Sequence, residues 1–165
     1  MDRTKVIFPG QNLSDGYRDY PIIFLAGPMI DSPAWHEKAI DILQGYKSEK
    51  LFRIATPHEW ISSPDGGRDH QIDWETEYIS NAAKKGCLLF WFPLPEKKSE
   101  RDYAQTSRVE IGIAMGEYKF KKFNLAVGID PQFNGEYYIK YKLRDLGVPV
   151  LRTLEDTCRR ALDLV

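Results

Sequence analysis

The run Cys87-Leu88-Leu89-Phe90-Trp91-Phe92-Pro93 has the unbroken apolar character of a parallel strand that is covered on both faces. Other short apolar runs, each separated from the next by a helical pattern, lie at Ile22–Ala26, Phe52–Ala55, Asn124–Ile129 and Val148–Leu151. Such alternation of strands and helices is typical of α/β proteins. The sequence therefore predicts a five-stranded parallel sheet with helices on both faces, and Lys5–Phe8 is a candidate for an additional edge strand.

The helices between these strands have recognisable start signals. Ser32-Pro33 is expected to cap a first helix that ends near Leu43, because serine caps helices and proline fits their first turn. The other helices are expected at about Asp69–Lys84, Ser107–Tyr118 and Tyr137–Leu146, with a last one from Thr153 to the end. In a sheet of this kind, ligands bind at the carboxyl ends of the strands. We expect the longer connections to form the walls and lid of that crevice, at residues 10–21, 62–68 and 93–106.

Charge balance and cysteine content exclude several classes of protein. The chain has 165 residues, enough for one domain, and its 23 basic and 24 acidic side chains leave no broad positive surface for nucleic acid. Its one basic cluster, Lys119, Lys121 and Lys122, is expected to be a solvated helix end. No stretch reaches the ~20 apolar residues that span a bilayer, and Cys87 and Cys158 give no metal or disulfide pattern. We expect a single-domain cytoplasmic protein that binds neither nucleic acid nor membrane.

Two acidic segments flank the central apolar run. Gln71-Ile72-Asp73-Trp74-Glu75 opens the helix that enters this strand, and Ser107-Arg108-Val109-Glu110-Ile111-Gly112 opens the helix that leaves it. In a parallel sheet both openings lie at the carboxyl ends of the strands, so Glu75 and Glu110 are expected to converge on one crevice. Two acids that face one crevice indicate chemistry at a glycosidic bond.

Glu110 has two interpretations. Ser107-x-x-Glu110 fits a capping box, in which the glutamate only bonds back to the start of its helix. Alternatively, a carboxylate at a helix N-terminus after the central strand is kept ionised by the helix dipole, as a nucleophile requires.

The segment around Glu75 also allows alternatives. Its acidity fits a solvated helix start, and His70, Asp73 and Glu77 have the helical spacing of metal ligands, but no second His or Cys set accompanies them. We therefore expect no metal.

The stretch Phe24-Leu25-Ala26-Gly27-Pro28 ends a central strand with a glycine. The glycine either lets a ligand approach the backbone closely or simply makes a tight turn. No glycine-rich dinucleotide or phosphate-binding loop is present, which argues against those cofactors.

Taken together, four motifs resemble the nucleoside 2-deoxyribosyltransferase family, in its branch of short deoxyribosyltransferase-like proteins. They are Phe24–Pro28 followed by Asp31-Ser32-Pro33-x-Trp35, then Gln71–Glu77, Leu89–Pro93 and Arg108-Val109-Glu110-Ile111-Gly112. The resemblance implies a flavodoxin-like α/β fold and the exchange of one nucleobase for another on 2-deoxyribose. It also implies that Ile23 replaces a tyrosine that orients the nucleophile in some relatives.

The same resemblance assigns roles to single residues. It implies that Glu110 is the nucleophile and that Glu75 handles the proton on the departing base. Asp73 or Glu77 takes the second role if Lys84-Lys85-Gly86 shifts the register. Substrate-binding residues would be Ala26, Gly27, Pro28, Asp73, Trp74 and Arg108.

The hypothesis is a double displacement with retention, in which Glu110 attacks C1′ while Glu75 protonates the base, and an incoming base reverses the path. The two acids would need two environments: Glu110 ionised, and the pKa of Glu75 raised by burial beside Trp74. The predicted ligands are 2′-deoxynucleosides and free nucleobases, with no cofactor.

The resemblance further implies a homo-oligomer with sites near the subunit interfaces, and the tyrosines Tyr137, Tyr138 and Tyr141 would suit such an interface. Two alternatives remain open: an N-glycosidase that hydrolyses nucleosides or nucleoside 5′-monophosphates, and a nonenzymatic nucleotide-binding module. The sequence does not decide between purines and pyrimidines.

Overall fold

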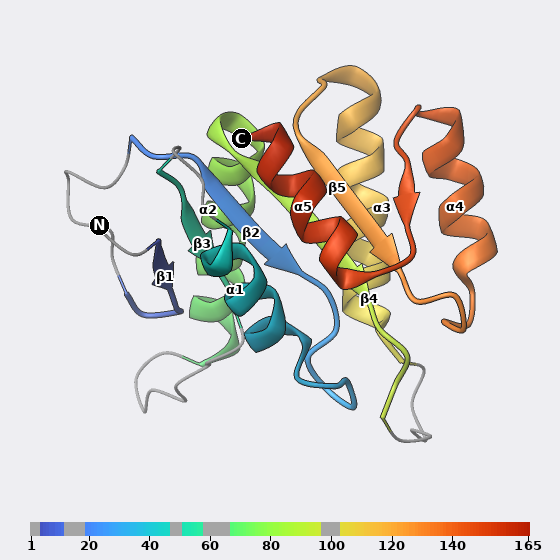
Figure 1. Ribbon diagram of the computed structural model, residues 1–165, viewed down its shortest axis with the longest axis horizontal. Helices are drawn as coiled ribbons and strands as arrows, with labels where there is room; N and C mark the ends of the chain where they lie inside the picture. Colours follow the sequence, from blue (N-terminus) through green and yellow to red (C-terminus); the bar gives the residue numbers. More distant parts are fainter. Residues whose placement is uncertain (1–3, 12–18, 47–50, 58–66, 97–102) are drawn as a thin grey trace.

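A six-stranded parallel sheet forms the centre of the computed structural model, which describes residues 4–11, 19–46, 51–57, 67–96 and 103–165 (Figure 1). The strands run in the order β1-β3-β2-β4-β5-β6. Their bounds are β1 Lys5–Ile7, β2 Ile22–Ala26, β3 Arg53–Ala55, β4 Cys87–Phe92, β5 Leu125–Ile129 and β6 Val150–Leu151. The helices are α1 Trp35–Gly45, α2 Arg68–Lys85, α3 Gln105–Phe120, α4 Glu136–Asp145 and α5 Leu154–Leu164.

The helices cover both faces of the sheet, which confirms the flavodoxin-like three-layer sandwich. One apolar core joins the sheet to α2, α3 and α4, and a second core joins it to α1 and α5, which lie in front in Figure 1. The five strands expected from the sequence are present to within two residues at each end. The candidate edge strand is also present as β1, paired with β3, so the sheet has six strands.

Strand β4 lies in the middle of the sheet, and the side chains on its two faces belong to the two cores. Leu88, Phe90 and Phe92 belong to the core under α2, α3 and α4. Cys87, Leu89 and Trp91 belong to the core under α1 and α5. All six residues are buried, because successive side chains of a strand point to opposite faces and both faces are covered here.

Two predicted helix starts are wrong. Helix α1 begins at Trp35, after Ala34 as its N-cap, and the Ser32 hydroxyl donates to the Pro33 carbonyl instead of capping the helix. Helix α3 begins at Gln105, two residues before the expected Ser107, and its N-cap Ala104 has a left-handed backbone with φ 61°. No side chain caps α3, so the capping box between Ser107 and Glu110 is absent.

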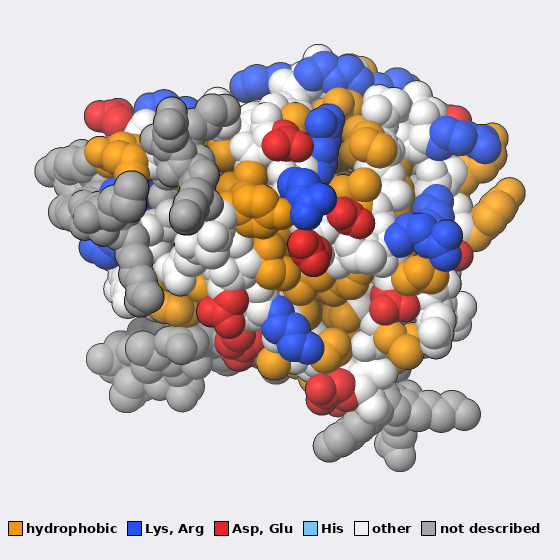
Figure 2. All heavy atoms as spheres, viewed as in Figure 1, with side chains coloured by type: hydrophobic (Ala, Val, Ile, Leu, Met, Phe, Trp, Pro, Cys, Tyr) orange, Lys and Arg blue, Asp and Glu red, His pale blue; other side chains and the backbone are white. Residues whose placement is uncertain are grey.

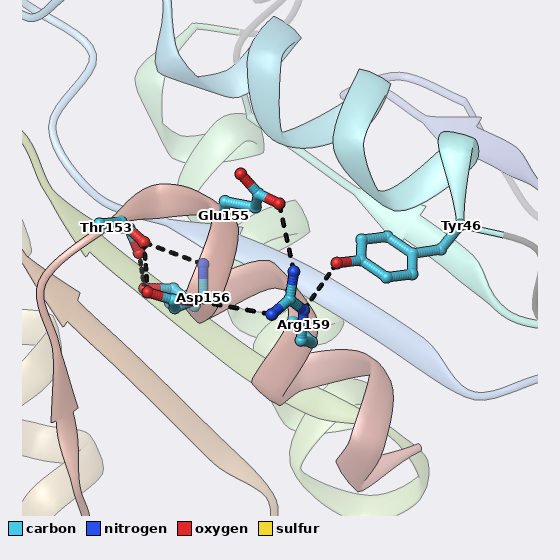
Figure 3. A network of polar contacts seen from close by, with 6 residues as sticks. Tyr46, Thr153, Glu155, Asp156 and Arg159 are labelled. Carbon is cyan, nitrogen blue, oxygen red and sulfur yellow. Dashed lines mark hydrogen bonds and ion pairs between the residues drawn. The ribbon is translucent and has the colours of Figure 1, made fainter.

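Helix α5 begins at Leu154, one residue after the predicted start, and Thr153 is its N-cap. Thr153 accepts a hydrogen bond from the Asp156 amide at 3.1 Å. Further along the helix, the Arg159 guanidinium donates to the Tyr46 hydroxyl at 2.7 Å and to Glu155 at 3.2 Å (Figure 3). This exposed network joins α5 to the end of α1 on the front face of the sheet.

The strand order fixes where a ligand site is expected. From β2 the chain moves to β3 on one side, whereas from β4 it moves to β5 on the other side. Crevices form at such reversals, outside the carboxyl ends of the two strands. Here these ends are Ala26 and Phe92, and the loops and helix starts beside them are candidates for the site. Within the described ranges, no helix is both long enough and apolar enough to cross a bilayer.

Candidate functional site

Glu75 and Glu110 lie on the two helices that flank β4 on the same face of the sheet. Helix α2 leads into the amino end of β4, so its first half lies toward the carboxyl edge of the sheet, and α3 starts at that edge. Both carboxyl groups are partly buried. The two carboxyl groups lie near enough to interact, since the negative charge of Glu75 raises the pKa of Glu110.

Burial controls the protonation of this pair. It raises the pKa of Glu110 to about 7, and the negative charge of Glu75 adds to the effect. Burial also raises the pKa of Glu75, while a hydrogen bond from Gln71 lowers it. Two carboxylates that repel each other do not both ionise easily, so the pair retains a proton near neutral pH.

The expectation that the helix dipole keeps Glu110 ionised is wrong for the free protein. Because α3 begins at Gln105, Glu110 is its sixth residue and lies beyond the first turn, where the dipole acts most strongly. The loss of solvent around the carboxyl group therefore dominates, and the pKa rises. For Glu75, the expected rise of the pKa through burial is present.

Gln71 is a site residue to which the sequence analysis gave no role. Its side-chain amide donates to Oε1 of Glu75 at 2.6 Å, one helical turn away. Such a bond fixes the carboxyl group and favours its ionised form. The i, i+4 spacing of Gln71 and Glu75 on one helix could have indicated this hydrogen bond from the sequence.

Trp74 anchors this part of α2 on the sheet. Its ring stacks on Tyr78 with centroids 4.5 Å apart and lies 6.2 Å from the ring of Phe24 on β2. The indole is buried, and its N–H has no hydrogen-bond partner among the described residues. Trp74 therefore positions its neighbour Glu75 and brings an unpaired donor to the same region.

The other acids of this segment lie differently. Asp73 and Glu77 are exposed, as is His70, whereas Glu75 is partly buried. Of the three carboxylates proposed for the second acid, Glu75 is the one whose charge raises the pKa of Glu110. The described part of the chain holds no cluster of three His, Cys, Asp or Glu side chains that could bind a metal ion.

The glycine turn after β2 is explained by packing. Gly27 has φ 154°, and a Cβ there would lie 2.3 Å from the Trp91 carbonyl oxygen and 2.8 Å from the ring of Trp35. The Pro28 carbonyl accepts a hydrogen bond from the Trp35 indole at 2.9 Å. Ala26 is buried beside Phe90 on β4. These contacts favour the tight-turn interpretation of Gly27 and place the turn beside the carboxyl end of β4.

Arg108 holds two loops of the carboxyl edge together. Its guanidinium donates to the Asn134 carbonyl at 2.8 Å and to the Tyr103 carbonyl at 3.3 Å, and it lies 4.8 Å from the centre of the Phe133 ring. A Cβ on Gly135 would lie 2.5 Å from it. In the free protein, Arg108 thus connects the start of α3 to the loop between β5 and α4.

A second polar group at this edge was missed by the sequence analysis. Burial raises the pKa of Tyr103 to about 12; the side chain of Ser32 lowers it, and the charges of Asp31 and Glu96 raise it. The Glu96 amide also donates to the Asp31 carbonyl at 3.0 Å. The loops after β2 and β4 therefore meet at Tyr103. Residues 12–18, 58–66 and 97–102, which include most of the expected walls and lid, lie outside the described residues.

Comparison with known proteins adds no assignment to this geometry. The chain matches no protein-family model, and no curated protein matches it at a significant level. The resemblance to nucleoside 2-deoxyribosyltransferases therefore rests on the four sequence motifs alone.

Proposed function

We propose that the protein is a nucleoside 2-deoxyribosyltransferase that exchanges nucleobases on 2′-deoxynucleosides. The observation that carries the proposal is the pair of partly buried acids, Glu75 and Glu110, which interact beside the carboxyl edge of a flavodoxin-like sheet. Two carboxyl groups that share a proton near neutral pH supply one acid and one base, as a retaining reaction at an anomeric carbon requires.

In the proposed reaction, a carboxylate oxygen of Glu110 attacks C1′ of the deoxyribose. The bond between C1′ and the base nitrogen breaks, and Glu75 gives its proton to the departing base. The product is a 2-deoxyribosyl ester of Glu110 with inverted configuration. The nitrogen of an incoming base then attacks C1′, the ester bond breaks and releases the Glu110 carboxylate, and the proton of the base passes to Glu75. This second displacement restores the original configuration.

This assignment requires that the shared proton lies on Glu75 when substrate is bound. In the free protein, burial favours the proton on Glu110, and the Gln71 hydrogen bond favours the ionised form of Glu75. An acceptor nitrogen of the bound base near Glu75 would stabilise the protonated form of that side chain. The proton then moves to Glu75 and leaves Glu110 as the nucleophile.

The proposal includes the surroundings of the site. No cofactor takes part, and the ligands are 2′-deoxynucleosides and free bases in the cytoplasm. Ala26, Gly27, Pro28, Asp73, Trp74 and Arg108 are the proposed substrate-binding residues. A homo-oligomer would cover the tyrosines of α4, of which Tyr137 is 79% and Tyr138 65% exposed.

The test is chromatographic. Purified protein is incubated with thymidine or 2′-deoxyinosine, with and without adenine, beside Glu110→Ala and Glu117→Ala. Glu117 is an exposed residue of the same helix and serves as the control. We expect 2′-deoxyadenosine from the parent and from Glu117→Ala, and none from Glu110→Ala. Mass spectrometry of the parent with donor alone should show a deoxyribosyl adduct on the peptide that contains Glu110.

Other outcomes separate the alternatives. Release of free base without formation of a new nucleoside would show that the protein is instead an N-glycosidase that uses the same acids. Absence of turnover with nucleosides and with nucleoside monophosphates would leave a nonenzymatic binding module. The two acids argue against a module that binds phosphate at this site, because like charges repel.

A further inference from the structure

A hollow of about 300 Å³ opens at the amino edge of the sheet, opposite to the edge of Glu75 and Glu110. It lies where the end of α3, the end of α5 and the turns that precede β5 and β6 meet. Its apolar walls come from Tyr118, Phe123, Leu125, Val148, Pro149 and Leu164. This volume is at the lower end of the range for small-molecule sites.

The charges around this hollow have one sign. Lys122 and Arg160 line it, and none of its lining residues is acidic. Lys119 and Lys121 lie on the adjoining end of α3. Figure 2 shows Lys and Arg side chains gathered along the upper rim, where Figure 1 places the amino ends of the strands. The basic cluster of the sequence therefore adjoins a cavity.

One donor of Arg160 has no partner in the described part of the chain. Its Nε is buried, and it has no hydrogen-bond partner among the described residues. The preceding Arg159 differs, because its guanidinium pairs with Tyr46 and Glu155. A buried donor without a partner is destabilising, and a hydrogen bond to a ligand or a water molecule would remove this cost.

Among the described residues that line the hollow, no acidic side chain faces Arg160. The ionisable side chain on which its charge acts is Cys87, and burial raises the pKa of that thiol to about 12, so the thiol is neutral. The side-chain amide of Asn124 donates to the carbonyls of Gly86 and Leu164, and thereby occupies two acceptors beside the hollow. Lys122 Nζ lies 4.1 Å from the centre of the Tyr118 ring, at the apolar wall.

We propose that this pocket binds a small organic anion, with its carboxylate or phosphate head held by Arg160 and Lys122 and its apolar body against Tyr118, Phe123 and Val148. An arginine fork binds either head group with two hydrogen bonds. The site is separate from the two acids and does not depend on the function proposed for them.

Calorimetric titration tests this proposal with three matched probes: phenyl phosphate, inorganic phosphate and phenol. Phenyl phosphate has both the phosphate head and the apolar ring. Inorganic phosphate has only the head, and phenol lacks the phosphate. We expect phenyl phosphate to bind at least tenfold more tightly than either fragment, and benzoate to compete with it. Equal affinity of phenyl phosphate and inorganic phosphate would overturn the organic ligand class, and absence of binding by phenyl phosphate and benzoate would overturn the site.

Variants locate the binding. Arg160→Gln should weaken phenyl phosphate binding at least tenfold, whereas Arg159→Gln, the same change one residue away, should leave it within twofold. Lys122→Gln and Lys121→Gln form a second matched pair on exposed positions, and they decide the question if Arg160→Gln does not fold. Equal effects within both pairs would show binding by general surface charge and would overturn the proposal. Glu110→Gln should bind the probe as the parent does.

Discussion

The negative charge of Glu75 raises the pKa of Glu110, although the whole of β4 separates the two residues along the chain. The two residues can interact because α2, which precedes β4, and α3, which follows it, pack on the same face of the sheet. Each carboxyl group therefore titrates as a member of a pair, and a change at one residue alters the protonation of the other.

The first prediction concerns stability and pH. The pKa of Glu110 rises from 4.5 to about 7 on folding, so the folded protein binds a proton more tightly than the unfolded chain does. The free energy of unfolding therefore falls as pH rises from about 4.5 through 7. Glu110→Gln removes this loss, and at pH 8 it should be more stable than the parent by about 3 kcal/mol, because each pKa unit corresponds to about 1.4 kcal/mol. Urea denaturation at pH 4.5, 6 and 8 measures the effect.

Glu117→Gln provides the control, because it removes a carboxylate from an exposed position of the same helix. It should follow the parent across the pH range. If Glu110→Gln were instead less stable than the parent at pH 8, ionised Glu110 would have to be stabilised by the fold.

The second prediction concerns Gln71. Its amide stabilises the ionised form of Glu75, so Gln71→Leu should raise the pKa of Glu75. A protonated Glu75 no longer repels charge on Glu110, and the pKa of Glu110 should then fall. Carbon NMR titration of the glutamate carboxyl groups measures both shifts without a substrate. Glu77→Gln, on the exposed face of α2, should move neither pKa by a comparable amount.

In an active transferase, the same variant should broaden the pH profile of kcat/KM. The acid limb, set by ionisation of Glu110, would move to lower pH, and the alkaline limb, set by loss of the Glu75 proton, would move to higher pH. A profile that moves in one direction without broadening would contradict the assignment of the two roles.

The apolar strands were predictable from sequence, whereas the starts of α1 and α3 and the partners of the polar side chains were not. A run such as Cys87–Phe92 is buried on both faces, so hydrophobicity alone marks it. The start of α3 depends on the left-handed backbone of Ala104, a conformation that an alanine in the sequence does not predict. Because of this two-residue difference, Glu110 lies beyond the first turn. Burial and the charge of Glu75, which the sequence does not reveal, raise its pKa to about 7. Arg108 contacts the carbonyl of Asn134, and partners so distant along the chain follow only from the fold.

The third prediction concerns this Arg108 contact. Arg108→Ala removes two hydrogen bonds from a charged donor and its packing on Phe133, so it should lower the free energy of unfolding by about 1–2 kcal/mol. Arg108→Lys keeps the charge but loses the planar fork, and should recover little of that stability. Arg144→Ala, which breaks an exposed 3.9 Å ion pair, should change stability by less than about 0.5 kcal/mol. Full recovery by lysine would show that charge alone matters at Arg108.

The last prediction concerns the turn between β2 and the crevice. Gly27→Ala places a Cβ 2.3 Å from the Trp91 carbonyl, at a φ that L side chains rarely adopt, so β2 and β4 must separate there. The cost should be at least about 2 kcal/mol. Gly116→Ala is the matched change on α3, where a Cβ meets nothing within 4 Å, and it should stabilise the protein by about 0.5–1 kcal/mol. Urea denaturation compares the two. Trp91 belongs to β4, the strand between the two helices that carry the acids. Gly27→Ala should therefore also alter the pKa of Glu110, whereas Gly116→Ala should not. Equal stability of the two variants would exclude the backbone contact as the reason for glycine at position 27.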